Sequence, residues 1–140
     1  MAGNITPIFA RVGKIQWAQE ATAVTGADLT NGALIFTADA TNGSIVNEVR
    51  VKYLPGTSTV ATVFRVWINN GSSVATTTNN TLISEISIAI ITTSQTAATV
   101  DYAVPMPRGG LVLPPGYSLH ATIGTYSTGT FMITAIGGDY

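Results

Sequence analysis

The stretch IVNEVRVKY, Ile45–Tyr53, alternates two kinds of side chain with a period of two residues. Charged side chains occupy Glu48, Arg50 and Lys52, whereas asparagine, valine and tyrosine occupy the odd positions from 47 to 53. Because successive side chains of a β-strand point to opposite faces, this pattern predicts a strand with one face in a core and the other in solvent. The following residues 54–57, Leu-Pro-Gly-Thr, predict a turn.

The next predicted strand, Val60–Asn69, is apolar on both faces. Phe64 and Val66 share one face, and Val63 and Trp67 share the other. Large apolar groups on both faces are typical of a strand in the middle of a sheet or beneath a partner. Two features follow this strand: residues 70–71, Asn-Gly, favour positive φ and predict a hairpin turn, and the polar residues 72–80 predict a weak strand and a long loop.

Alternating or short apolar runs predict further strands in the rest of the chain, at Gly32–Ala40, Leu82–Thr92, Thr99–Val104, Gly110–Leu113, Tyr117–Thr125 and Phe131–Ile136. Residues that favour turns separate these runs at intervals of roughly 8–12 residues. This pattern predicts an all-β chain that forms one domain, a β-sandwich or jelly roll of eight or nine strands.

The first 20 residues differ from the rest in showing only one short run with strand character, Ile8–Val12, and no helix. We expect residues 1–20 to form an extended N-terminal arm and residues 21–140 to form the sandwich domain. Pro7 disfavours a helix at the start. Phe9 and Trp17 are large apolar side chains of the arm, and we expect them to clasp a neighbouring subunit. The alternative is a strand-like lead-in that packs Trp17 against its own domain.

The composition is unusual for a free monomer. Charged residues make up 9% of the 140 residues, against about 25% in an ordinary soluble domain. A surface with so few ionic groups is expected to be covered by other protein. The net charge of −1 comes without a basic block, which argues against a nucleic-acid partner. No apolar run reaches the ~18 residues of a membrane helix, and we expect no membrane partner.

Catalytic and metal-binding chemistry has weak support in the sequence. Ser118 and His120 are two residues apart on a predicted strand, but they lack the strained nucleophile turn of serine hydrolases. The chain has one histidine and no cysteine, so a zinc site within one chain is not expected. Residues 39–43, Asp-Ala-Thr-Asn-Gly, are too few and too poor in acids for a calcium loop and predict a plain turn. We therefore predict no catalytic residue, no metal and no cofactor.

Aromatic residues are the better candidates for contacts with a partner. We single out four of them as proposed partner contacts: Phe9, Trp17, Trp67 and Tyr126. Tyr126 lies in a predicted loop, where an exposed ring could also stack on a sugar. Packing in the core or at an interface is the alternative for each of these side chains.

The segment VPMPRGGLVLPPGYSL, Val104–Leu119, combines an apolar strand, a Pro-Gly turn and a returning strand. Together with the Thr- and Asn-rich stretch Phe64–Thr99, which has few charges and no cysteine, it resembles small tailed-phage virion proteins of the capsid decoration, or cement, class. The resemblance implies a β-sandwich, often a homotrimer, bound to the major capsid protein where capsomers meet. It carries no functional residue over to this chain.

These observations predict a virion structural protein without enzymatic activity. We expect an oligomeric decoration protein that stabilises a phage head. The resemblance implies assembly in the host bacterial cytoplasm. The N-terminal residues 1–4 show no basic start followed by an apolar block, so we expect no secretory signal. The alternative is a receptor- or carbohydrate-binding module of a phage tail fibre or spike.

Overall fold

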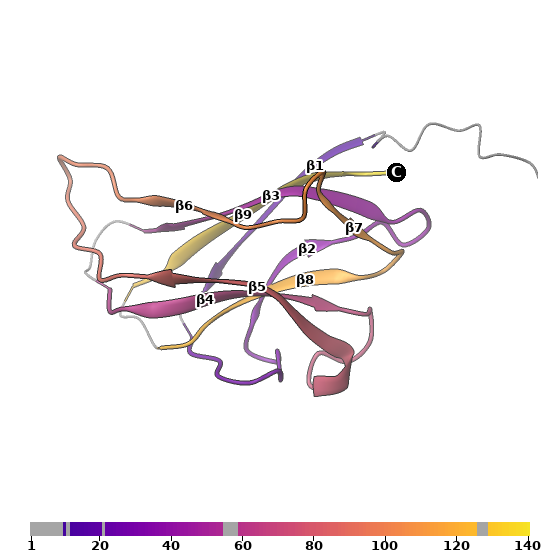
Figure 1. Cartoon of the computed structure of the whole chain (residues 1–140), viewed down its shortest axis with the longest axis horizontal. Helices are drawn as coiled ribbons and strands as arrows, with labels where there is room; N and C mark the ends of the chain where they lie inside the picture. The colour runs from indigo at the N-terminus through magenta and orange to yellow at the C-terminus, as the bar shows by residue number, and fades with distance from the viewer. Residues whose placement is uncertain (1–9, 11, 21, 55–58, 126–128) are drawn as a thin grey trace, which may run out of the picture.

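In the computed structural model, which describes residues 10, 12–20, 22–54, 59–125 and 129–140, two β-sheets pack face to face (Figure 1). The first sheet has the strand order β1-β9-β3-β6, with β7 also paired to β3, and the second has the order β2-β8-β4-β5. The prediction of an all-β sandwich is confirmed. Among the described residues, one 3-10 turn, η1 (Thr77–Asn79), lies between β4 and β5. The strands are β1 (Val12–Glu20), β2 (Ala33–Thr37), β3 (Ser44–Tyr53), β4 (Thr62–Asn69), β5 (Asn80–Ile88), β6 (Asp101–Val104), β7 (Leu111–Leu113), β8 (Ser118–Ile123) and β9 (Phe131–Asp139).

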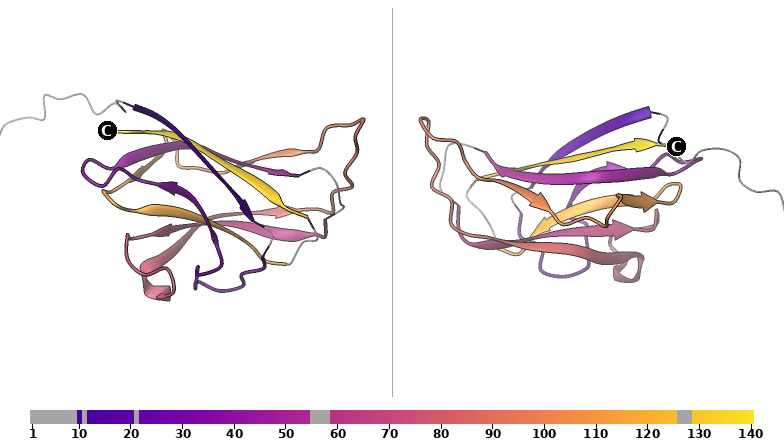
Figure 2. Two further views of the ribbon diagram at one scale, coloured as in Figure 1. Left: turned by 180° about the vertical axis from the view of Figure 1, so that it is seen from behind. Right: turned by 45° about the horizontal axis from the view of Figure 1, so that its top comes forward.

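The pairing of the strands follows one simple scheme if β7 is set aside. β1 pairs with β9, β2 with β8, β3 with β6 and β4 with β5, all antiparallel. The chain therefore forms a long ribbon that doubles back between β4 and β5. Successive pairs of this ribbon alternate between the two sheets, which is the wrapping of a jelly roll. Figure 2 shows the two layers from behind and with the top of the molecule tilted forward.

The core lies between the inner faces of the two sheets. Val49, Val51 and Tyr53 of β3 are at most 1% exposed, which confirms these three positions of the predicted inward face. Asn47, expected on the same face, is exposed, because the register of β3 with β9 shifts between Val46 and Glu48. The Tyr53 and Phe131 rings meet edge to face with their centroids 5.0 Å apart. Phe64 and Val66 of β4 are fully buried on the opposite sheet. Each large side chain buried in this way stabilises the fold by about 1.5–3 kcal/mol.

The described part of the expected arm is a strand of the sandwich. β1 pairs with β9 along all nine of its residues, from Val12 opposite Asp139 to Glu20 opposite Phe131. Trp17 therefore stands on a sheet and belongs to the domain. Residues 1–9 and 11 lie outside the described residues.

Two further boundaries differ from those expected. β9 continues through Gly137 and Gly138 to Asp139, three residues beyond its predicted end. The expected tight hairpin at Asn70-Gly71 is wrong, because the chain between β4 and β5 is closed by a hydrogen bond from Asn70 N to Asn79 O. This connection holds η1 and no weak strand.

Candidate functional site

β1 reverses the usual alternation of an edge strand. Its inward positions carry Lys14, Gln16 and Glu20, whereas its outward positions carry Ile15 and Trp17. A sheet strand ordinarily turns its apolar residues to the core and its polar residues to water. The reversal raises two questions: what holds the polar side chains inside, and what covers the apolar side chains outside.

The inward side chains bind the backbone of β2, the edge strand of the other sheet. Lys14 Nζ donates to Thr37 O at 2.7 Å, and Thr37 N donates to Gln16 Oε1 at 2.7 Å. At the other end of β1, Ala33 N donates to Glu20 Oε2 at 2.9 Å. Backbone groups at a sheet edge need partners, and a free edge invites pairing with another chain. These side chains satisfy part of the β2 edge.

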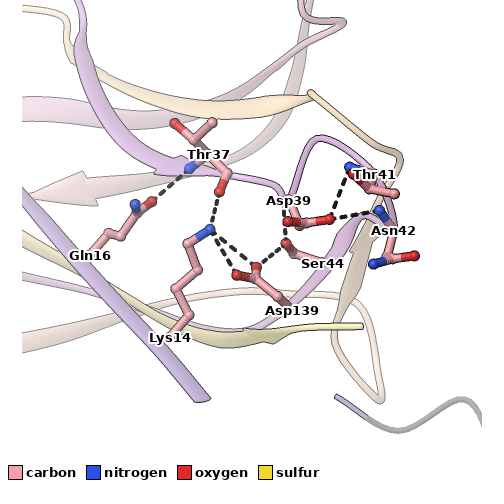
Figure 3. Close-up of polar contacts among 8 residues, drawn as sticks. All are labelled: Lys14, Gln16, Thr37, Asp39, Thr41, Asn42, Ser44 and Asp139. Carbon is pink, nitrogen blue, oxygen red and sulfur yellow. Dashed lines mark hydrogen bonds and ion pairs between the residues drawn. The ribbon is translucent and has the colours of Figure 1, made fainter. Parts of the chain in front are cut away.

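A polar network joins the two sheets around Lys14 (Figure 3). Lys14 Nζ lies 3.1 Å from Asp139 Oδ1, and Ser44 Oγ donates a hydrogen bond to the same oxygen. Asp39 N in turn donates to Ser44 Oγ at 2.8 Å. The network links β1, β9, β3 and the loop after β2. It explains why a charged residue occupies an inward position of β1.

The outward side chains of β1 form an exposed apolar surface. Trp17 is 69% exposed and Ile15 is 60% exposed. Together with Leu34 of β2, which is 50% exposed, they line a pocket of about 320 Å³ whose other walls are Gln16 and Thr37. We call these five residues the β1 flank. Isolated exposed apolar residues are common, but a contiguous group that includes a tryptophan is typical of a protein interaction site.

The surface next to the β1 flank changes from apolar to charged across the sheet. Ile15 and Trp17 oppose Ile136 and Thr134 of β9. On the next strand, β3, the outward side chains are Glu48, Arg50 and Lys52, and Arg50 pairs with Asp101 of β6 at 2.6 Å. The outward side chains on the β1 side of this sheet are therefore apolar, whereas those on the β6 side are charged and suited to contact with water.

The other aromatic residues proposed as partner contacts are less accessible or are not described. Trp67 is 8% exposed, and its Nε1 donates to Thr122 Oγ1 at 2.9 Å. The loop of residues 22–32 contacts the sheet that holds Trp67, where Val24 N donates a hydrogen bond to Ile123 O of β8. Little of the Trp67 side chain is therefore left for a partner. Phe9 and Tyr126 lie outside the described residues, so the proposed contacts through them stay predictions, as does a sugar site at Tyr126.

Comparisons were made with protein-family models, with curated proteins and with solved structures, and none of them matches this chain. Among the residues described, no three or more His, Cys, Asp or Glu side chains group into a metal site, and no helix has the length and apolarity to cross a membrane. The β1 flank is the feature of the described residues that most clearly calls for a partner.

Ser118 and His120 do come together, as their spacing predicts. Ser118 Oγ lies 3.1 Å from His120 Nε2, and the two residues are 8% and 6% exposed. His120 Nδ1 is buried and has no hydrogen-bond partner among the described residues. In a catalytic triad an acid binds this nitrogen and orients the ring. The pair is therefore a buried hydrogen bond on β8, without the acid that such a triad uses.

The burial of His120 predicts a pH-dependent stability. Burial lowers the pKa of His120 below its ordinary value of 6.5. The unfolded chain therefore binds a proton below pH 6.5 while the folded chain does not, so stability is lost as the pH falls toward the folded pKa, by up to about 1.4 kcal/mol per pH unit. We expect the free energy of unfolding, measured with urea at pH 7 and pH 5, to fall less for His120→Gln than for the wild type. Equal losses would show that His120 contributes nothing.

The turn at residues 39–43 is the plain turn that the sequence predicts. Asp39 Oδ1 accepts hydrogen bonds from Asn42 N at 2.7 Å and from Thr41 N at 2.9 Å. These bonds, the one from Asn42 first, hold the pKa of Asp39 below its ordinary value. Gly43 then takes a positive φ of 77°, which favours glycine. The Asp39 carboxylate closes the turn.

Proposed function

We propose that this chain is a structural protein of a tailed-phage virion, without enzymatic activity, that associates with copies of itself and with the major capsid protein and stabilises the head. The observation that carries the proposal is the β1 flank, with Trp17 69% exposed in a chain of which 9% is charged. A tryptophan in such a position buries a large apolar area when a partner covers it. Repeated around a shell, many modest contacts of this kind add up through multivalency.

The fold and the composition support the same proposal. Jelly rolls are common in viral capsid proteins and also in lectins. A fold alone does not assign a function, so the exposed flank and the low charge carry more weight. A chain without cysteine also suits assembly in a reducing cytosol.

The protein composition of purified virions tests this proposal. Particles from the bacterium that carries the gene are separated on a density gradient, and their proteins are quantified by mass spectrometry. We expect the chain to band with the major capsid protein, in many copies per particle. Its presence in the tail fraction alone would favour the receptor- or carbohydrate-binding module, and its absence from particles would contradict a virion protein altogether.

A further inference from the structure

The edge strands of the sandwich differ in how they are protected from pairing with another chain. β6 and β7, which both pair with β3, have four and three residues, and β2 has five and a register shift between Leu34 and Phe36. β5 has a register shift against β4 and carries the charged Glu85, which pairs with Arg65 at 3.1 Å. Short length, bulges and charges are the features that keep natural sheet edges from pairing.

β1 is neither short nor bulged, and its two charged side chains, Lys14 and Glu20, point inward and bind groups of the same chain. It is nine residues long, and its register with β9 has no shift. Its outward positions 13–19 hold glycine, isoleucine, tryptophan and glutamine, so no charge stands on that face. β9 is the one strand paired with β1 among the residues that the structure describes. A long and regular edge with apolar side chains on its outward face is the kind that adds a further strand.

We propose that two copies of this chain pair through β1, antiparallel, about a two-fold axis at Gln16. This arrangement deepens the proposed function by naming the first partner of the β1 flank and the geometry of the contact. A two-fold axis perpendicular to the sheet keeps the outward faces of both strands on one side. With Gln16 opposite its own copy, all nine residues of each strand are paired, from Val12 opposite Glu20 of the second copy.

The sequence of β1 complements itself in this register. Ile15 stands opposite Trp17 of the second copy, and the symmetry repeats this pair on the other side of the axis. Pairs of an aromatic and a β-branched residue are among the favourable cross-strand neighbours. Lys14 faces Ala18 and Glu20 faces Val12, so no two like charges stand opposite each other. The paired strand lies along the pocket that Leu34 also lines, which covers a third apolar side chain of each copy.

The register can be measured directly, because the chain has no cysteine of its own. A spin label on Gln19→Cys, an exposed outward position of β1, stands opposite Gly13 of the second copy. The two labelled positions are then six residues apart along the strands, or about 20 Å. Native mass spectrometry of the full chain is expected to give a dimer. Double electron–electron resonance between the two spin labels is expected to give this distance. A monomer at every concentration, a trimer, or a clearly different distance would overturn the proposal.

A matched pair of variants distinguishes pairing through β1 from non-specific association of exposed apolar side chains. Ile15→Glu places a charge on the proposed contact, and Ile90→Glu makes the same change at an isoleucine that is 68% exposed elsewhere. We expect the dissociation constant of the dimer to rise at least tenfold for Ile15→Glu and to stay within twofold for Ile90→Glu, with both variants folded by circular dichroism. An unchanged constant for Ile15→Glu, or an equal rise for both, would overturn the proposal. These experiments use no particles, so their failure is distinguishable from absence of the chain from virions.

Discussion

Gly137→Ala is expected to lower the free energy of unfolding by about 3 kcal/mol, because a methyl group at this position overlaps backbone. Gly137 lies in β9 opposite Lys14 of β1 and Val46 of β3. A Cβ atom built there would overlap the carbonyl oxygen of Ile45 and come within 3.0 Å of Val46 Cα. Neither atom belongs to a flexible side chain, so the strands would have to move apart. Urea denaturation at one fixed protein concentration measures the loss, since association also shifts apparent stability.

The matched control for this substitution is Gly13→Ala in β1. A Cβ atom there meets no atom of the described residues within 4 Å. Its effect on stability is expected to stay within about 0.5 kcal/mol, as for most surface substitutions. If Gly137→Ala changed the free energy of unfolding no more than Gly13→Ala does, the close approach of β9 to β3 described above would be wrong.

Lys14→Met is expected to cost about 2 kcal/mol of stability, because it leaves two acceptors at the junction of the sheets without their donor. Methionine replaces the aliphatic part of the side chain with a similar unbranched one and removes the charged amino group. Thr37 O then loses its hydrogen bond of 2.7 Å, and the Asp139 carboxylate, which is 22% exposed, loses its cation. The Lys14 Nζ atom also lies 5.1 Å from the centre of the Phe36 ring, and that contact is lost as well.

Lys52→Met is the control for the loss of a lysine as such. Lys52 is an exposed residue on the outward face of β3, and its replacement is expected to change stability by less than about 0.5 kcal/mol. Thermal and urea unfolding of the two variants are compared at the same salt concentration, because exposed charges are screened by salt. Equal stabilities of the two variants would contradict the structural importance of the Lys14 network.

The strands that alternate in the ordinary way could be predicted from the sequence. β3 is the clearest case, since Glu48, Arg50 and Lys52 face out and the valines between them face in, as expected. β4 is also correct in place and character: Phe64 lies in the core, and Trp67 lies on the other face, 8% exposed and bound to Thr122 of β8. In both strands the local pattern and the tertiary burial agree, except at Asn47, which is exposed next to the register shift of β3.

β1 could not be recognised in the same way, because its pattern is inverted. A strand whose inward positions hold Lys14, Gln16 and Glu20 looks polar where a core is expected. Its stability depends on Thr37, Asp139 and other groups that lie far away in the sequence. The sequence around β1 contains no pattern that predicts such distant partners. The sequence shows Ile15 and Trp17 as apolar side chains, but it does not show that they lie on an edge strand.

The prediction from glycine and asparagine is wrong at two other places, Gly137–Gly138 and Asn70–Gly71. Gly137 and Gly138 were expected to end the last strand, yet β9 needs them because β3 and β1 approach closely there. Asn70-Gly71 was expected to form a tight hairpin. Instead Asn69 Nδ2 donates to Asn80 Oδ1 at 2.8 Å, and Asn80 Nδ2 donates to the carbonyls of Ala27 and Val74. These side chains organise a longer connection that backbone propensity does not indicate.

The central claim is that other protein covers the β1 flank in the native assembly. The most direct test compares how much wild-type chain and how much Trp17→Ala chain is present in virions. The protein contents of gradient-purified particles are quantified as above, with Val112→Ala, which changes a side chain that is 60% exposed, as the control. We expect wild type and Val112→Ala to be present at equal levels and Trp17→Ala to be reduced about tenfold, as for a tryptophan hot spot. Particles that carry Trp17→Ala at the wild-type level would contradict the account.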